Sequence, residues 1–162
     1  MLSSVISHDD CRKCRFCCSF RRVSLWETPL FDADTVTRLT EKYPEANFVK
    51  RGDAYTTDLS DRYHTDDPEE EALCPFNRDG CILGADDKPF DCSIWPLRVM
   101  RYDGALAICL TPTCPTVSAK PLSILKELAD GNVGDRIIEY ALGHGYIIKD
   151  YREGFPVLRK FS

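Results

Sequence analysis

Residues 11–18 read CRKCRFCC, which places Cys11, Cys14, Cys17 and Cys18 within eight residues and ends on an adjacent pair. A spacing of two residues lets a tight turn direct two sulfurs toward one centre. Adjacent side chains, in contrast, point about 100° apart in a helix and to opposite faces in a strand. If residues 11–18 are helical, Cys11, Cys14 and Cys18 share one stripe and Cys17 lies at its flank. We therefore expect that Cys17 and Cys18 are not equivalent and do not serve the same metal ion in the same way.

Later stretches of the chain supply more cysteines. The segment CPFNRDGC, residues 74–81, contains an Asn-Arg-Asp-Gly turn that would fold its two terminal sulfurs toward each other. Thiolate ligands select zinc, copper(I) and iron-sulfur clusters, because soft sulfur matches soft or borderline metals. Eight sulfurs suffice for two four-cysteine zinc sites, or for one cluster and one zinc. The candidate metal ligands are Cys11, Cys14, Cys17, Cys18, Cys74, Cys81, Cys92 and Cys114.

Composition and charge narrow the class of protein. Of the 162 residues, 43% are hydrophobic and 29% are charged, as in an ordinary globular domain. The N-terminal MLSSVISHDD has no basic segment before an apolar run, so we expect no signal peptide and a cytoplasmic location. In that reducing compartment, nine cysteines are better explained as metal ligands or redox thiols than as disulfides. No apolar stretch approaches the roughly 20 residues of a membrane span. The net charge of -5 disfavours nucleic acid as the main partner.

Charge is unevenly distributed along the chain. Such runs are usually solvated surface, which is the interpretation we favour. The alternative is that the basic run offsets thiolate charge at a metal centre or receives an anionic ligand. The basic residues around the first cysteines are Arg12, Lys13, Arg15, Arg21 and Arg22, and the acidic residues before Cys74 are Asp53, Asp58, Asp61, Asp66, Asp67, Glu69, Glu70 and Glu71.

The pattern of apolar residues predicts a small α+β domain spanning residues 1–162, with a loop-rich metal-binding half, short hairpins and C-terminal helices. A cysteine core over 11–115 precedes a helical extension over 116–162. Residues 60–92 are rich in Asp, Pro and Gly, so we expect metal rather than backbone pairing to order them.

Individual elements follow from local signals. A helix is predicted at 32–43, capped by Asp32 or Asp34, with Val36 and Leu39 inward. Hairpins are predicted at 47–57 around Gly52-Asp53 and at 96–110 around Asp103-Gly104, and a last strand at 145–151. Two further helices are predicted at 121–131 and 134–145, with apolar faces formed by Leu125, Leu128, Ile137, Ile138 and Leu142.

Two further groups of residues invite a functional interpretation. Cys109, the ninth cysteine, shares a strand face with Ala105 and Ala107, which favours a packed small side chain over a ligand. The rival interpretation is a Cys109-x4-Cys114 ligand pair. His8, His64 and His144 are candidates for mixed metal ligation or acid-base chemistry. The strongest candidate is His64, because it is close to Asp66 and Asp67 in the sequence, although a solvated acidic loop explains that trio better.

These motifs resemble the CxxCxxCC (YkgJ-type) family, described as zinc- or iron-chelating domains. The run at 11–18 has the family's spacing, and the resemblance extends to residue 115. Trp95 stands where the family usually has tyrosine, and Thr116 where a glycine is expected. The matching positions are Cys74-Pro75-Phe76, Gly80-Cys81, Pro89-x-x-Cys92, Trp95-Pro96 and Cys114-Pro115. The resemblance implies a cysteine-bound metal centre, and a related core in flagellin lysine N-methylase pairs an iron-sulfur centre with methyl transfer.

The leading hypothesis is therefore a cytoplasmic protein that binds metal ions through its cysteines. The triplet at 11–17 favours a [4Fe-4S] cluster, whereas the paired knuckles equally suit zinc. A second hypothesis is an enzyme that modifies a protein substrate by methyl transfer at the metal centre. A third is a metal carrier or redox sensor without catalysis. The sequence has no nucleotide-binding fingerprint and no nucleophile-base pair, so it predicts no catalytic residues.

Overall fold

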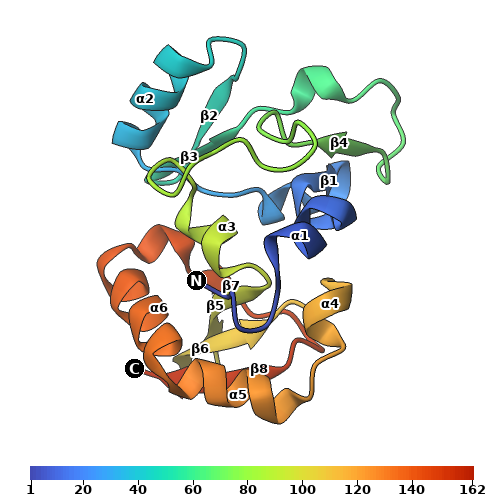
Figure 1. The fold of residues 1–162 in the computed structure, drawn as a ribbon. Coiled ribbons are helices and arrows are strands. Elements are labelled where there is room, and N and C mark those ends of the chain that lie inside the picture. The colour runs from blue at the N-terminus through green and yellow to red at the C-terminus, as the bar shows by residue number, and fades with distance from the viewer. The chain divides into compact units, whose positions relative to one another are not determined.

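The computed structural model describes all 162 residues and divides them into two compact units. One comprises residues 11–92 and is called the cysteine-rich unit. The other comprises residues 1–10 and 93–162 and is called the sheet unit. Helices and small sheets occur in both, which confirms the predicted α+β class (Figure 1). The predicted partition into residues 11–115 and 116–162 stays a prediction.

The first cysteines lie on two short helices rather than one. Helix α1 (His8–Cys14) ends before Arg15, whose φ of 54° belongs to the left-handed region, and the 3-10 helix η1 (Phe16–Cys18) follows. A left-handed residue cannot continue a right-handed helix. The expected single helical stripe through Cys11, Cys14 and Cys18 is therefore wrong.

Two antiparallel strand pairs and one longer helix form the rest of the cysteine-rich unit. Strand β1 (Ser19–Arg21) pairs with β4 (Glu71–Leu73), and β2 (Phe48–Arg51) pairs with β3 (Ala54–Thr57) in the predicted hairpin. Helix α2 (Ala33–Lys42) is confirmed, and its N-cap is Asp32, whose carboxylate accepts the Thr35 N–H at 2.7 Å. Short 3-10 helices η2 (Arg22–Glu27) and η3 (Ser60–Arg62) complete the unit.

The core of this unit is largely aromatic and reaches the cysteines. The rings of Phe31 and Phe76 lie 6.1 Å apart, and Phe48 packs edge-on against Phe31 at 5.3 Å. Cys74 is buried among the core side chains, and Cys18 packs against them. The pairing of β1 with β4 also corrects the expectation that residues 60–92 lack backbone pairing, because β4 lies within that segment.

The sheet unit contains a four-stranded sheet in the order β7-β5-β6-β8. Strands β5 (Leu97–Tyr102) and β6 (Ala105–Leu110) form the predicted hairpin. Asp103 and Gly104 both have positive φ, 52° and 75°, as a tight two-residue turn requires. The expected strand at 145–151 shrinks to the 3-10 helix η4 (Gly145–Ile147) and β7 (Lys149–Asp150), and the last strand is β8 (Val157–Phe161).

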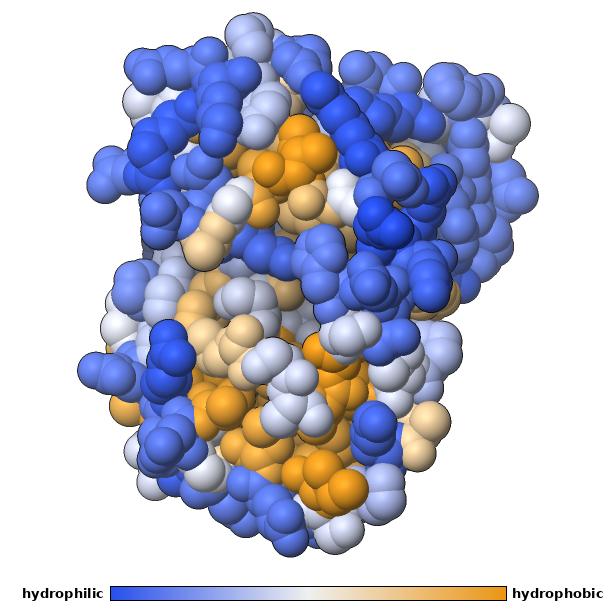
Figure 2. All heavy atoms as spheres, viewed as in Figure 1, coloured by the Kyte–Doolittle hydropathy of each residue, from blue (hydrophilic) through white to orange (hydrophobic).

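Helices α5 (Leu122–Asp130) and α6 (Asn132–Gly143) confirm the two predicted C-terminal helices. They contact β8 and β5, respectively (Figure 1). Leu125 and Ile137 are buried as expected, but Leu142 is 61% exposed and faces solvent. Figure 2 shows that the sheet unit carries much of the apolar surface on the face drawn. The remaining helices are α3 (Phe90–Ile94) and α4 (Pro115–Ser118). None of the helices combines the length and apolar character needed to cross a membrane.

Candidate metal centre

None of the nine cysteines forms a disulfide bond. Of the eight predicted ligands, seven lie in the cysteine-rich unit, and Cys114 lies in the sheet unit just before α4, where it is 7% exposed. Cys109 is fully buried on β6 in a small core with Met100 and Ala107, which confirms the predicted packing. That Cys109 is not a ligand stays a prediction.

Backbone geometry brings Cys18, Cys74 and Cys81 into the same region of the cysteine-rich unit. The Cys74 N–H donates to the Cys18 carbonyl at 2.6 Å, next to the β1–β4 pairing. The predicted turn then returns the chain, with Asn77 bridged to Cys81 and the Gly80 N–H donating to Asn77 Oδ1 at 3.3 Å. A sharp reversal at this point requires the positive φ of Gly80, 115°, which is a glycine conformation.

Cys17 and Cys18 interact as a hydrogen-bonded pair of thiols. This bond lowers the pKa of Cys18 to about 6, with further lowering by a hydrogen bond from Asn77 and by the charge of Lys88, against the opposing effect of burial. The same bond raises the pKa of Cys17, together with burial and repulsion from Cys18, Cys92 and Cys11. The two adjacent side chains therefore lie together rather than diverging as expected. They are nevertheless inequivalent, since Cys18 is the first of the two to ionise.

Cys74 and Cys92 are held as neutral thiols by burial. Loss of solvation raises the pKa of Cys74 to about 12 and raises that of Cys92 well above its usual value. Repulsion from Cys18 and Cys81 acts on both in the same direction. These interactions define a five-thiol cluster of Cys17, Cys18, Cys74, Cys81 and Cys92, assembled from η1, the 74–81 turn and α3.

The two N-terminal cysteines differ from the five-thiol cluster in their surroundings. Cys11 and Cys14 are exposed on α1, a helix that has no buried residue. Cys11 still lies near enough to Cys17 to raise its pKa. The structure contains no group of three or more His, Cys, Asp or Glu side chains arranged closely enough to hold a metal ion. The assignment of the eight cysteines as metal ligands therefore stays a prediction.

The basic run of the sequence pairs with acidic residues, two of them in the acidic run, which sequence reasoning did not anticipate. Arg21 contacts Glu69 at 2.7 Å, Arg22 contacts Glu70 at 3.3 Å, and Arg15 reaches Asp79 at 3.4 Å. Exposed pairs of this kind contribute roughly 0–1 kcal/mol each. Most of the predicted basic patch is therefore neutralised within the cysteine-rich unit. Two basic residues of α1, Arg12 and Lys13, make no ion pair.

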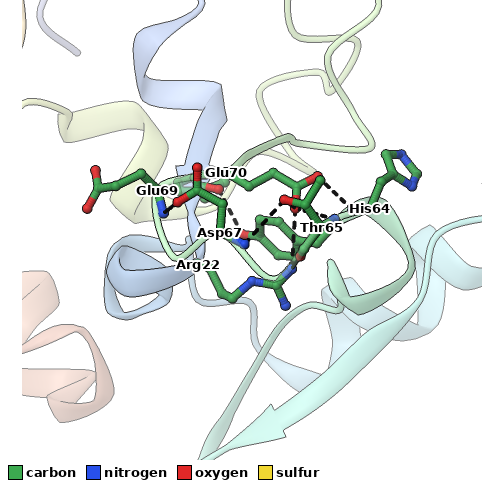
Figure 3. Close-up of polar contacts among 8 residues, drawn as sticks. Arg22, His64, Thr65, Asp67, Glu69 and Glu70 are labelled. Carbon is green, nitrogen blue, oxygen red and sulfur yellow. Dashed lines mark hydrogen bonds and ion pairs between the residues drawn. The ribbon is translucent and has the colours of Figure 1, made fainter.

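Glu70 is the centre of a hydrogen-bond network that orders residues 64–70 (Figure 3). Its carboxylate accepts the N–H groups of His64 at 2.6 Å and of Thr65 at 2.8 Å, the Thr65 hydroxyl at 2.8 Å, and Arg22 Nη2 at 3.3 Å. The hydrogen bond from His64, followed by those from Thr65 and Arg22, lowers the pKa of Glu70 to about 2. Hydrogen bonds from backbone N–H groups to the Glu70 carboxylate therefore order part of the segment that we expected metal to order.

The three candidate histidines lie in different surroundings. The imidazole of His64 points away from Asp67 in Figure 3, and only its backbone N–H enters the network. His144 stacks on Tyr140 at 4.0 Å after the last turn of α6, with Nδ1 3.0 Å from the Tyr140 carbonyl oxygen. His8 is the first residue of α1 and is exposed. The favoured interpretation of His64 in a solvated acidic loop agrees with this arrangement.

Comparisons with models of known protein families, with curated proteins and with solved structures find no match to this chain. The candidate centre therefore depends on the chemistry and placement of the residues of this chain.

Proposed function

We propose that this protein binds a thiophilic metal centre, either zinc or an iron-sulfur cluster, through the thiolates of its cysteine-rich unit. The observation that carries the proposal is the five-thiol cluster, in which three segments far apart in the sequence bring unpaired thiols within electrostatic range of one another. Metal binding is the chemistry that sulfur-only donor sets most often serve in a reducing compartment. The resemblance to the CxxCxxCC family is part of this proposal.

The chemistry of the donor atoms supports such a centre. Sulfur is the preferred ligand of zinc in structural sites and of iron-sulfur clusters. Desolvation and mutual repulsion keep Cys74 and Cys92 protonated, and a bound cation would remove both penalties by accepting the thiolates directly. The proposed ligands are the five-thiol cluster together with Cys11 and Cys14, and their sulfurs must close further before they share an ion. Cys114 remains a predicted eighth ligand.

Loading under anaerobic, reducing conditions tests the proposal. The protein is incubated separately with Zn²⁺ and with Fe²⁺ plus sulfide and desalted, and its metal content and visible absorption are measured. We expect Cys74→Ser to lose at least one metal equivalent because it removes a buried member of the five-thiol cluster. The matched variant Cys109→Ser, also at a buried cysteine, should retain full stoichiometry. A wild-type protein that retains neither zinc nor a cluster would refute the proposed function.

Methyl transfer to a protein substrate and redox sensing stay predictions from the sequence. No arrangement of residues in the structure favours either over metal binding.

A further inference from the structure

Strand β2 has one edge that pairs with no other strand. The sheet of β2 and β3 is extended only on the β3 side, where the Tyr55 N–H donates to the Phe31 carbonyl at 2.9 Å and the Phe31 N–H donates to the Tyr55 carbonyl at 2.7 Å. Tyr55 therefore directs both of its backbone groups away from β2. Its register partner on β2 is Lys50, whose N–H and C=O point the opposite way, out of the free edge.

Phe48 has the same orientation as Lys50. The Asp58 N–H donates to the Asn47 carbonyl at 2.8 Å, so hydrogen-bonded and outward-facing positions alternate along the hairpin, and Phe48 falls in the outward-facing set. No other backbone group of the protein bonds to the N–H or C=O of Phe48 or Lys50. An open edge of this kind can take up an extended peptide as a further strand through main-chain hydrogen bonds.

The side chains of β2 combine an apolar group with two cations. Val49 is 45% exposed and lies on the same face as Arg51, whereas Lys50 is exposed on the other face. The Arg51 guanidinium is held through Nη1, which donates to the Leu25 carbonyl at 2.6 Å and to Thr28 Oγ1 at 2.8 Å. Both partners are neutral, and loss of solvation lowers the pKa of Arg51. A carboxylate beside this guanidinium would offset the loss of solvation.

The cations of the edge strand β8, in contrast, are already paired. Arg159 contacts Asp135 at 2.7 Å, and Lys160 contacts Asp103 at 3.3 Å. The two cations of β2 make no ion pair, so their charge is available to a ligand. A lysine on an open edge also opposes pairing with a second copy of the same strand, because like charges would then face each other. The β2 edge therefore favours an acidic partner strand over another copy of this chain.

We infer that β2 binds an extended acidic segment of a partner protein as an added antiparallel strand. The antiparallel direction continues the β2–β3 hairpin and is the more stable pairing. Carboxylates opposite Lys50 and Arg51 and an apolar side chain opposite Val49 would match the side chains of β2. The partner segment therefore has the order acidic, acidic, apolar in its own N-to-C direction. This inference does not depend on the proposed metal centre.

Peptide binding to the full-length protein tests the choice of partner. A short fluorescent peptide with the central sequence Asp-Glu-Val between threonines is titrated with the protein, and its anisotropy is measured. We expect saturable binding that weakens by roughly fivefold when the centre is changed to Asn-Gln-Val. Lys50→Glu should weaken binding of the acidic peptide by at least as much, whereas Lys126→Glu, at an exposed lysine on α5, should leave it unchanged. No binding, or equal affinity for the acidic and amide peptides, would overturn the inference.

Methylation of the peptide backbone tests strand addition separately from charge. In the antiparallel register, the N–H of the central glutamate faces Lys50, and the N–H of the following valine faces away from β2. N-methylation of the glutamate should therefore abolish binding, and N-methylation of the valine should leave the affinity nearly unchanged. Equal effects of the two methyl groups would show that the peptide does not add as a strand.

Amide hydrogen exchange followed by NMR locates the peptide on β2. In the free protein the outward-facing amides of Phe48 and Lys50 should exchange rapidly, and those of Val49 and Arg51, which face β3, should exchange slowly. Saturating acidic peptide should slow exchange at Phe48 and Lys50. Rapid exchange at both amides with the peptide bound would contradict the inference. Protection that is already present in the free protein and increases with protein concentration would identify a second copy as the occupant and would also contradict it.

Discussion

Cys17 and Cys18 show how neighbouring residues with the same side chain acquire different chemistry. Cys18 accepts hydrogen bonds from Cys17 and from Asn77, and these stabilise its thiolate although the side chain packs against the aromatic core. Cys17 retains its proton in the shared hydrogen bond, and its ionised form would be repelled by Cys92. The sequence predicted that the two cysteines are inequivalent, but it attributed the difference to one continuous helix with Cys18 on its cysteine stripe and Cys17 at the flank. The break at Arg15 could not be foreseen, because left-handed arginine has no local sequence signal.

At the residue scale, we expect Cys18→Ser to lower metal content more than Cys17→Ser. Serine at position 18 removes the thiolate that Cys17, Asn77 and Lys88 stabilise, whereas serine at position 17 keeps that thiolate and offers a hydroxyl that can donate to it. Elemental analysis after loading measures the difference, with Cys109→Ala as a control that should keep its metal. Identical losses for the two serine variants would show that the hydrogen-bonded pair acts as a single ligand unit.

Glu70 gives a second prediction at this scale. Its pKa in the folded protein, about 2, lies below its ordinary value of 4.5, so its ionised form stabilises the fold. This stabilisation is fully present above about pH 4.5 and is lost as pH falls toward 2. We expect the Thr65 amide to lose protection from hydrogen exchange over that window, and Glu70→Gln to show the loss already at pH 7. Glu69→Gln, which removes only the exposed pair with Arg21, should behave like the wild type.

At the scale of elements, those specified by local signals could be predicted from the sequence, whereas long-range strand pairings could not. The Asp103-Gly104 turn and the Asp32 cap act within a few residues, so the hairpin and helix α2 could be predicted from the sequence. The pairing of β1 with β4 joins three-residue strands about 50 positions apart, and β8 pairs with β6 across a similar distance. Strands β1, β4 and β8 have no alternating pattern long enough to be recognised.

The close approach of Gly134 in α6 to the end of α5 gives a prediction at the scale of elements. A Cβ at Gly134 would lie 1.7 Å from the Ala129 carbonyl oxygen, so the backbone at the end of α5 would have to shift. We expect Gly134→Ala to lower the free energy of unfolding by about 3 kcal/mol, at the upper end of overpacking effects. Gly143→Ala is the matched control, because no atom lies within 4 Å of its Cβ position. That variant should be neutral or slightly stabilising in urea denaturation. A similar loss for both variants would contradict the close approach as the cause, because nothing lies near the Gly143 Cβ position and helix propensity favours alanine at both sites.

At the scale of the whole molecule, the chain changes units twice. Residues 1–10 belong with 93–162, so in the sequence the cysteine-rich unit lies between two segments of the sheet unit. The sequence pattern placed the end of the cysteine region near residue 115 because the last candidate ligand, Cys114, lies there. The hairpin β5–β6 joins the C-terminal strand β8 in one sheet, which is a long-range pairing. Seven of the proposed ligands remain in a single unit.

This division predicts that metal removal acts on one unit. Structural metal contributes on the order of 10 kcal/mol to small metal-binding domains, and that energy should stabilise the unit that holds the ligands. We expect chelation to increase hydrogen exchange in residues 11–18 and 74–92, whose thiols are the proposed ligands. The 64–70 turn should change less because Glu70 orders it, and β5, β6 and α5 should keep their protection because they pack in the sheet unit.

Mass spectrometry of deuterium uptake, segment by segment, measures this pattern in the metal-loaded and chelated protein. Cys74→Ser is the matched control: its uptake without added chelator should resemble that of the chelated wild type in residues 11–18 and 74–92. The same measurement also tests whether Cys114 is a ligand, because Cys114 is buried beside α4 in the sheet unit. If Cys114 is a ligand, α4 should loosen together with the cysteine-rich unit, and Cys114→Ala should abolish that response. Unchanged uptake in residues 74–92 after complete metal removal would contradict the coupling of folding to metal binding.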